Sequence, residues 1–333
     1  MSTPQVAVAM DWGGTWTRTA LVDRQGEILW QSRQPNPQEG SKEEYLQIAE
    51  SLLSEAVDRA AGPIAGIGAA VAGPVEPTTG TFHQPPNLMV LDGVSFKELW
   101  EPRFFLPVWV GNDANLAAFG EYHYGAGKES NDNGQPVKTL FYVTVSTGVG
   151  GGIADNGSLF LGANGLTGEI GHTVADPTAG GLTCQCGAKG CVESLASGKA
   201  IGRIARDKVA SGDHPGSSLT ALPTASVDAS AVFDAAEQKD PLAVSIVDDA
   251  VDALSIGLTN VMHLFNPDMI VLGGGVTDGL VRLDLLPWIH RQVRGRAMSR
   301  LHGEFQLTSS RLGDSVGLVG AAAMVWQQSD EKP

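Results

Sequence analysis

The chain of 333 residues is short of cysteine, of cationic residues and of long apolar runs. The three cysteines, an odd number in a tight cluster, suit metal ligation better than a disulfide framework, so we expect a reducing compartment. Lys and Arg number 22 against 37 Asp and Glu, a formal charge of -15, which disfavours binding to nucleic acid or to an anionic membrane. The longest uncharged apolar stretches, residues 63–75 and 315–326, are too short or too rich in Gly and Pro to span a bilayer. A folded cytoplasmic protein without a signal peptide is expected.

An apolar strand, a glycine turn and a second strand follow one another twice along the chain. The first unit starts with residues 6–10 and turns at 11–15, and the second starts with residues 140–145 and turns at 146–152. This repeat predicts two similar α/β halves that each present a glycine turn to a shared cleft. Ser41 and Glu44 form a capping box that predicts a helix. The polar residues 125–138 are predicted to be a loop insertion.

The first glycine turn, from Asp11 to Thr15, has the residue types that a phosphate site needs. Glycine lets the backbone approach phosphate oxygens, N–H groups and the Thr15 hydroxyl can donate to them, and the Asp11 carboxylate can hold hydrated Mg²⁺. The turn at residues 146–152 is again rich in glycine but is not a Walker A loop. A third glycine run, residues 273–275, follows a strand and is a candidate nucleoside contact. A plain glycine turn is the alternative in all three cases.

Asn112 and Asp113 follow a predicted strand at residues 108–110. An Asp at this place lies in the first turn of a helix, where the helix dipole favours the ionised carboxylate. A sugar hydroxyl needs such a carboxylate to accept its proton during attack. N-capping is the alternative, because Asp and Asn are preferred cap residues.

One histidine and all three cysteines form the most specific pattern in the chain: His172, Cys184, Cys186 and Cys191. One imidazole and three thiols make a ligand set of structural zinc, and four protein ligands leave no open position for catalysis. We therefore predict a structural zinc that fixes the nearby Glu169 and Glu193, and we disfavour a zinc hydrolase. Inert buried thiols are the alternative.

Together these motifs resemble the ROK family of sugar kinases and related repressors over nearly the whole chain. The match includes Asp11-x-Gly-Gly-Thr-x-x-Arg18, Ala72-Gly-Pro-Val75, Pro86-Asn-Leu88, Gly111-Asn-Asp113, Ser146-Thr-Gly-x-Gly-Gly-Gly152, Glu169-x-Gly-His172 and Cys184-x-Cys-Gly-x-x-Gly-Cys-x-Glu193. Two departures are the bulky Trp12 and Trp16 in the first turn and a long spacing between His172 and Cys184.

The resemblance implies an α/β protein with the two-domain actin-like, ribonuclease H-like ATPase fold, in which duplicated halves surround a central cleft. Residues 1–118 would form the N-terminal domain, joined by a C-terminal helix at about residues 315–330, and residues 119–314 the C-terminal domain. A homodimer or homotetramer would be the assembly.

The resemblance also implies transfer of a phosphoryl group from ATP to the 6-hydroxyl of glucose, with Asp113 as the catalytic base. The sugar contacts would be Asn87, Asn112, Asp113, Glu169, His172 and Glu193. The contacts to ATP and Mg²⁺ would be Asp11, Gly13, Gly14, Thr15, Thr147, Gly148, Gly274 and Gly275. The zinc ligands would be His172, Cys184, Cys186 and Cys191.

Other functions stay open at this point. Within the family, a kinase for N-acetylmannosamine or N-acetylglucosamine and a fructokinase are the next alternatives, because the shared contacts discriminate poorly between hexoses. A non-catalytic sugar-sensing regulator is the alternative of a different class. The family's repressors carry an N-terminal helix-turn-helix, and a phosphate loop that begins at residue 11 leaves no room for one, so we expect an enzyme.

Overall fold

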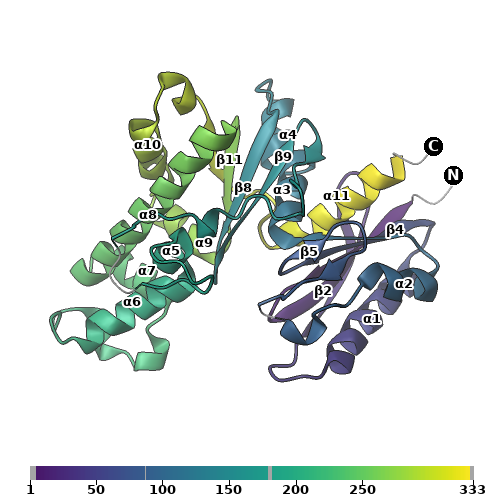
Figure 1. The fold of residues 1–333 in the computed structure, drawn as a ribbon, viewed down its shortest axis with the longest axis horizontal. Coiled ribbons are helices and arrows are strands. Elements are labelled where there is room, and N and C mark those ends of the chain that lie inside the picture. Colours follow the sequence, from purple (N-terminus) through teal and green to yellow (C-terminus); the bar gives the residue numbers. More distant parts are fainter. Residues whose placement is uncertain (1–4, 87, 179–181, 331–333) are drawn as a thin grey trace. The chain divides into compact units, whose positions relative to one another are not determined.

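The computed structural model describes residues 5–86, 88–178 and 182–330, and the chain divides into two compact units (Figure 1). Unit 1 comprises Met1–Val137, Gly152–Thr167 and Ser310–Pro333, and unit 2 comprises Lys138–Gly151 and Gly168–Ser309. None of the helices within these described ranges is both long enough and apolar enough to cross a membrane.

Unit 1 is built on a five-stranded sheet with the order β3-β2-β1-β4-β7. The first three strands are an antiparallel meander, and β4 and β7 then run parallel to β1. The bounds are β1 Val6–Trp12, β2 Trp16–Val22, β3 Ile28–Pro35, β4 Ile64–Val71 and β7 Val108–Asn112. The meander places the first glycine turn between β1 and β2, and the parallel strands bring the end of β7 to the same edge of the sheet.

The two faces of this sheet are covered by different helices, because successive residues of β1 point to opposite sides. Val8, Met10 and Trp12 pack with residues of α1 (Lys42–Arg59) and α2 (Phe96–Phe104). Ala7 and Ala9 pack with residues of the C-terminal helix α11 (Val316–Asp330), which returns to unit 1 from the far end of the chain. The small alanines allow this helix to approach the sheet closely, whereas the larger residues fill the opposite core.

Trp12 belongs to this core and not to the exposed part of the glycine turn. Its side chain has no exposed surface and stacks on Trp100 with ring centroids 6.2 Å apart, while Phe96 contacts it at 5.4 Å. Aromatic pairs of this kind contribute about 0.5–1.5 kcal/mol each beyond the area that they bury. Trp16 differs, because 39% of it is exposed and the Arg33 guanidinium lies over its ring. Trp12 therefore anchors the glycine turn in the hydrophobic core of unit 1.

Helix α1 begins as the sequence predicts. The Ser41 hydroxyl accepts a hydrogen bond from the Glu44 backbone N–H, and the Glu44 carboxylate accepts one from the Ser41 backbone N–H. The capping box is confirmed.

The polar segment 125–138 is not only a loop, because it contains helix α4 (Ala126–Asp132). The cause is Glu121, a fully buried residue of α3 (Asp113–His123), whose carboxylate accepts a hydrogen bond from the Ala126 backbone N–H. The same carboxylate accepts hydrogen bonds from Ser310 and Leu312. Helices α3 and α4 both belong to unit 1, whose first segment extends to Val137, and residue 118 lies within α3.

The second sheet has the order β10-β9-β8-β11-β12, and β11 runs parallel to both β8 and β12. Its strands are β8 Thr139–Val145, β9 Val149–Asp155, β10 Ser158–Leu159, β11 Met269–Gly273 and β12 Gln306–Ser309. The helices of unit 2 are α5 Val192–Ala196, α6 Gly198–Ala210, α7 Ala229–Glu237, α8 Pro241–Phe265, α9 Gly275–Arg282 and α10 Leu286–Arg296. In unit 1, a two-stranded sheet of β5 (Val75–Glu76) and β6 (Thr81–Phe82) completes the fold.

The second glycine turn is shorter than the sequence predicts. Strand β9 already begins at Val149, so only residues 146–148 form the turn between β8 and β9. The Val149 backbone N–H is held by the carboxylate of Glu193 at 2.9 Å, a contact 44 residues away in the sequence. Local composition alone does not reveal such a contact.

Candidate phosphoryl-transfer and metal sites

Asp11 is the next-to-last residue of β1 in unit 1. Its carboxylate forms an ion pair with Arg18 at 3.2 Å and packs against Gly317 in the first turn of α11. The Arg18 guanidinium also donates to the Asp314 carbonyl, so it joins the glycine turn to the start of α11. Burial raises the pKa of Asp11, and the neighbouring Arg18 charge partly lowers it again. This half-buried carboxylate is the kind of single oxygen ligand that Mg²⁺ uses beside phosphate groups.

The glycine turn itself leaves backbone exposed. Gly14 and Thr15 are exposed, whereas Gly13 is half-buried and donates its N–H to the Trp16 carbonyl at 3.1 Å. Asn36, which directly follows β3, contacts this turn through hydrogen bonds to Gly13, Thr15 and Thr17. Sequence reasoning missed Asn36, because the residue belongs to no motif.

Asn112 and Asp113 lie at the junction of β7 and α3. Asn112 is the N-cap, and its side-chain oxygen accepts hydrogen bonds from the N–H groups of Ala114 and Asn115. Its amide nitrogen donates to the Gly73 carbonyl at 3.3 Å. Asp113 is the first residue of the helix, and its carboxylate accepts a hydrogen bond from the Ala114 N–H at 2.8 Å. The N-cap is therefore Asn112, and Asp113 lies in the first turn of α3, at the positive end of the helix dipole.

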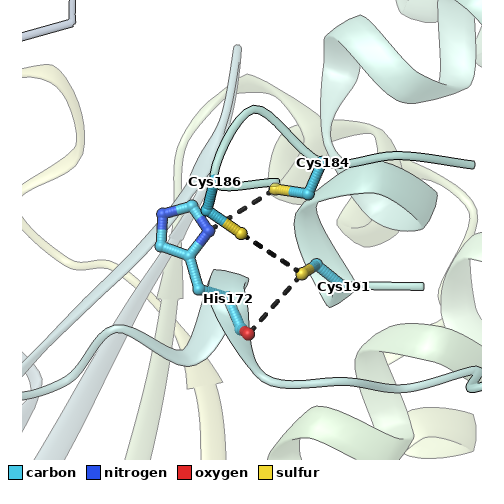
Figure 2. A group of neighbouring side chains, drawn as sticks. All are labelled: His172, Cys184, Cys186 and Cys191. Atoms are coloured by element: carbon cyan, nitrogen blue, oxygen red, sulfur yellow. Dashed lines mark hydrogen bonds between the residues drawn. The ribbon is translucent and has the colours of Figure 1, made fainter. Parts of the chain in front are cut away.

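The four predicted zinc ligands lie together in unit 2. Their ligand atoms all lie within 4.8 Å of one another, and Figure 2 shows the side chains converging on one point. The Cys186 and Cys191 sulfurs are 3.7 Å apart, and the Cys184 sulfur is 3.5 Å from His172 Nδ1. In a tetrahedral zinc site with ordinary bond lengths, sulfur atoms are about 3.8 Å apart and sulfur and nitrogen about 3.6 Å apart. The donor set and its spacing therefore fit zinc.

The protonation of these thiols also depends on their environment. Burial raises the pKa of the Cys191 thiol to about 12 and raises the pKa of Cys184 as well. The Cys186 thiol is exposed, and the Ala188 backbone N–H beside it lowers its pKa. Two buried thiols that resist ionisation are inert on their own, but a bound cation deprotonates such ligands.

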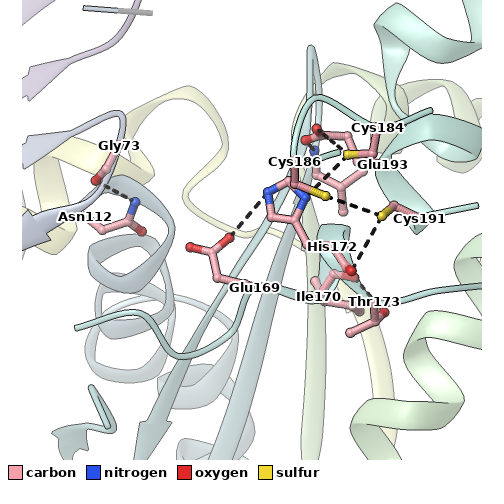
Figure 3. A network of polar contacts seen from close by, with 11 residues as sticks. Gly73, Asn112, Glu169, Ile170, His172, Thr173, Cys184, Cys186, Cys191 and Glu193 are labelled. Atoms are coloured by element: carbon pink, nitrogen blue, oxygen red, sulfur yellow. Dashed lines mark hydrogen bonds and ion pairs between the residues drawn. The ribbon is translucent and has the colours of Figure 1, made fainter. Parts of the chain in front are cut away.

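Glu169, His172 and Glu193 surround the cysteine cluster (Figure 3). His172 turns Nδ1 toward Cys184, and its Nε2 is 4.0 Å from the Glu169 carboxylate. Burial raises the pKa of Glu169, with a smaller opposing effect of His172. One Glu193 oxygen is 3.8 Å from the Cys184 sulfur, and the other accepts the Val149 N–H. The two carboxylates thus lie beside the cluster, Glu169 next to the imidazole and Glu193 next to the Cys184 sulfur.

The glycine in the Glu169-x-Gly-His172 motif has a steric reason. A Cβ atom on Gly171 would lie 2.0 Å from the Val149 carbonyl oxygen, so only glycine lets this short helical turn (Ile170–His172) approach β9. Val149 is therefore contacted from two sides, by Gly171 and by Glu193.

The remaining predicted nucleotide contacts of unit 2 gather near the second glycine turn. Thr147 is exposed, and its carbonyl accepts a hydrogen bond from Lys199 in the first turn of α6. Gly148 is so close to Glu193 that a Cβ atom would lie 2.6 Å from its carboxylate. Gly274, the N-cap of α9, lies against Val145 just before the turn, and Gly275 has open space around it.

The predicted residues therefore fall into two groups. Unit 1 holds Asp11, Gly13, Gly14, Thr15, Asn112 and Asp113, and unit 2 holds the zinc ligands, both glutamates and Thr147, Gly148, Gly274 and Gly275. Asn87 lies outside the described residues.

The architecture defines the class of protein. Two α/β units, each containing a strand, a glycine turn and a second strand, form the actin-like, ribonuclease H-like ATPase fold that solved ROK sugar kinases share. Residues 7–328 match the sequence model of the ROK family, and the chain belongs to that family.

Both a glucokinase and a repressor are among the relatives. The chain is 34% identical to the glucokinase of Halalkalibacterium halodurans over 97% of its own length and 96% of that protein. It is 32% identical to a putative xylose repressor of a Caldicellulosiruptor species, over 96% of this chain but 77% of the repressor. Among solved structures, a ROK family glucokinase from Streptomyces griseus in complex with glucose and AMPPNP matches with a TM-score of 0.77 and 30% identity, over 97% of this chain and 99% of that one.

Proposed function

We propose that the protein is an ATP-dependent glucokinase that phosphorylates the 6-hydroxyl of glucose. The observation that carries the proposal is Asp113, a carboxylate in the first turn of α3, directly after the strand β7 and the N-cap Asn112. Near full-length similarity to a glucokinase, and to a structure with glucose and AMPPNP, supports the substrate and the donor.

In this proposal Asp113 is the general base. It accepts the proton of the 6-hydroxyl while the oxygen attacks the γ-phosphorus of ATP and the bond to ADP breaks. Phosphoryl transfer needs little covalent chemistry from the protein, so positioning and charge neutralisation supply most of the catalysis. The positive end of the α3 dipole favours a negative charge at this position.

The donor would be bound by Asp11, Gly13, Gly14 and Thr15 of unit 1 and by Thr147, Gly148, Gly274 and Gly275 of unit 2. Bound Mg²⁺ would neutralise charge on the phosphate oxygens. Asp11 would hold its hydration shell, and the glycine turns would offer backbone N–H groups to the phosphates.

The sugar hydroxyls would be bound by Asn112, Glu169, His172 and Glu193, with Asn87 as a further contact. A structural zinc on His172, Cys184, Cys186 and Cys191 would fix the loop that carries them. His172 supports this assignment, because Nδ1 faces the thiols while Nε2 faces Glu169 and stays available to a hydroxyl beside it.

A kinase for N-acetylmannosamine or N-acetylglucosamine and a fructokinase remain the alternatives within the family. The repressor relative supports a sugar-sensing regulator as the alternative of another class. Cytoplasmic location and a homodimeric or homotetrameric state complete the proposal, and sedimentation of the purified protein tests the assembly.

The test is a coupled ADP-release assay with glucose, fructose, mannose and the two N-acetylhexosamines. We expect glucose to give the highest kcat/KM, and Asp113→Ala to lower kcat by about 10²–10⁴-fold while glucose binding persists. Sugar binding without ADP release for every hexose would favour the regulator. Near-normal turnover of Asp113→Ala would remove Asp113 from the role of base.

A further inference from the structure

Asn36 is bound to the first glycine turn by three hydrogen bonds. Its side-chain amide donates to the Gly13 carbonyl at 2.7 Å, and its side-chain oxygen accepts from the Thr17 hydroxyl at 2.6 Å. Its backbone N–H donates to the Thr15 carbonyl at 2.8 Å. Thr17 is fully buried and Asn36 is half-buried, so the hydrogen bond between these two side chains is shielded from water.

These contacts determine which way the turn presents its backbone. In a planar trans peptide, the carbonyl of one residue and the N–H of the next point in opposite directions. Because the Gly13 carbonyl points to Asn36, the Gly14 N–H points away from Asn36. The Thr15 carbonyl is withdrawn in the same way. Carbonyl oxygens repel phosphate, whereas N–H groups bind it, so this arrangement is the one that an anion site requires.

The side chain at position 36 must donate and accept at once. An amide does both, because its nitrogen carries two donors and its oxygen accepts. An ionised carboxylate of the same size only accepts, so it would keep the contact with Thr17 and repel the Gly13 carbonyl. The partners therefore select asparagine over aspartate.

We propose that Asn36 is a positioning residue for the phosphoryl donor. Asn36 holds the Gly13 and Thr15 carbonyls toward itself, so that the Gly14 N–H faces the phosphates of ATP. This inference rests on the proposed kinase function. It assigns to the residue after β3 a role in donor affinity and none in sugar affinity.

The test compares Asn36→Asp with Tyr45→Phe as a matched control. The Tyr45 hydroxyl donates to the Pro37 carbonyl at 2.6 Å, so the control loses one hydrogen bond from the same connecting segment without touching the glycine turn. We expect Asn36→Asp to raise the KM for ATP at least tenfold, to weaken AMPPNP binding in calorimetry to the same degree, and to leave the Kd for glucose within twofold. Tyr45→Phe should leave all three values unchanged.

Thr17→Val provides a second variant, because it removes the hydrogen bond from the Thr17 hydroxyl to Asn36. The hydrogen bond from the Asn36 amide to the Gly13 carbonyl is kept. Thr17→Val should raise the KM for ATP in the same direction by a smaller factor. If the wild type is active and the KM for ATP of both Asn36→Asp and Thr17→Val stays within twofold of the wild-type value, the inference is overturned. The kinase proposal is not affected by that result. A wild type that releases no ADP with any hexose overturns the kinase proposal instead. An equal loss of glucose and AMPPNP affinity in Asn36→Asp would assign Asn36 a general structural role and would also overturn the inference.

Discussion

The Glu193 carboxylate accepts a hydrogen bond from the Val149 backbone N–H at 2.9 Å, and this contact joins the loop of the cysteine cluster to the second glycine turn. Glu193 lies in the first turn of α5, directly after the ligand Cys191, and Val149 is the first residue of β9. Glu193, a proposed sugar contact, is thus hydrogen-bonded to the residue that follows the proposed nucleotide contacts Thr147 and Gly148.

Two substitutions of Glu193 should separate these roles. Glu193→Gln keeps an oxygen for the Val149 N–H but loses the charge, so we expect a higher KM for glucose with little change in the KM for ATP. Glu193→Ala also leaves the Val149 N–H without its partner, so both KM values should rise. Steady-state kinetics with each substrate varied in turn measures this. Identical effects of the two substitutions would mean that the hydrogen bond to Val149 has no part in nucleotide binding.

Loss of one thiol should release the metal. Cys191 is fully buried in the cluster, so we expect Cys191→Ser to lose bound zinc and thermal stability together, since binding energy at a structural zinc site is folding energy. Atomic emission on protein purified without chelator gives the zinc content, and a melting curve gives Tm. Less than half an equivalent of zinc in the wild type would speak against the site.

Arg18 should keep the acid limb of the pH profile of kcat/KM for ATP at lower pH. Burial raises the pKa of Asp11 and Arg18 lowers it, so Arg18→Gln should raise it further. Asp11 must be ionised to hold Mg²⁺, and the acid limb of kcat/KM for ATP should therefore move to higher pH in the variant. A profile between pH 5 and 9 measures the shift. A limb that stays in place or moves to lower pH contradicts this role of Asp11.

Gly320 should tolerate no side chain. Its Cβ atom would lie 1.9 Å from the Leu116 carbonyl oxygen, where α11 packs directly on α3. Gly320→Ala should lower the free energy of unfolding by about 1–3 kcal/mol, because backbone has to move. Gly295 in α10 is the control, since a Cβ there meets nothing within 4 Å, and Gly295→Ala should raise stability by up to about 1 kcal/mol. Urea unfolding followed by circular dichroism compares the two, and equal stability of Gly320→Ala and wild type would contradict this packing.

Sequence reasoning located the features whose parts lie close together along the chain. The cysteine cluster follows from ligand type, and the convergence of His172 with Cys184, Cys186 and Cys191 is what that pattern predicts. The junction of β7 and α3 follows from a short strand and a cap residue. The capping box of α1 is equally local.

Contacts between distant residues were out of reach. Asn36 is 23 residues from Gly13, and Arg18 is 296 residues from its partner Asp314, so no spacing in the sequence indicates either contact. Helix α4 was missed for the same reason, because the buried Glu121 that holds its first turn gives no sign of burial in a polar sequence. What the sequence does not reveal is which polar side chains become buried.

The place of α11 has a consequence for the order of folding. Strands β1 and β2 expose the alanine face formed by Ala7, Ala9 and Ala20 until Leu318 and Ala321 arrive from the C-terminal helix. During synthesis on the ribosome, about 300 residues therefore emerge before this face of the first sheet can be covered. The nascent chain must keep an unfinished apolar layer from aggregating, and a message truncated before residue 316 would yield a polypeptide that never closes its own N-terminal core.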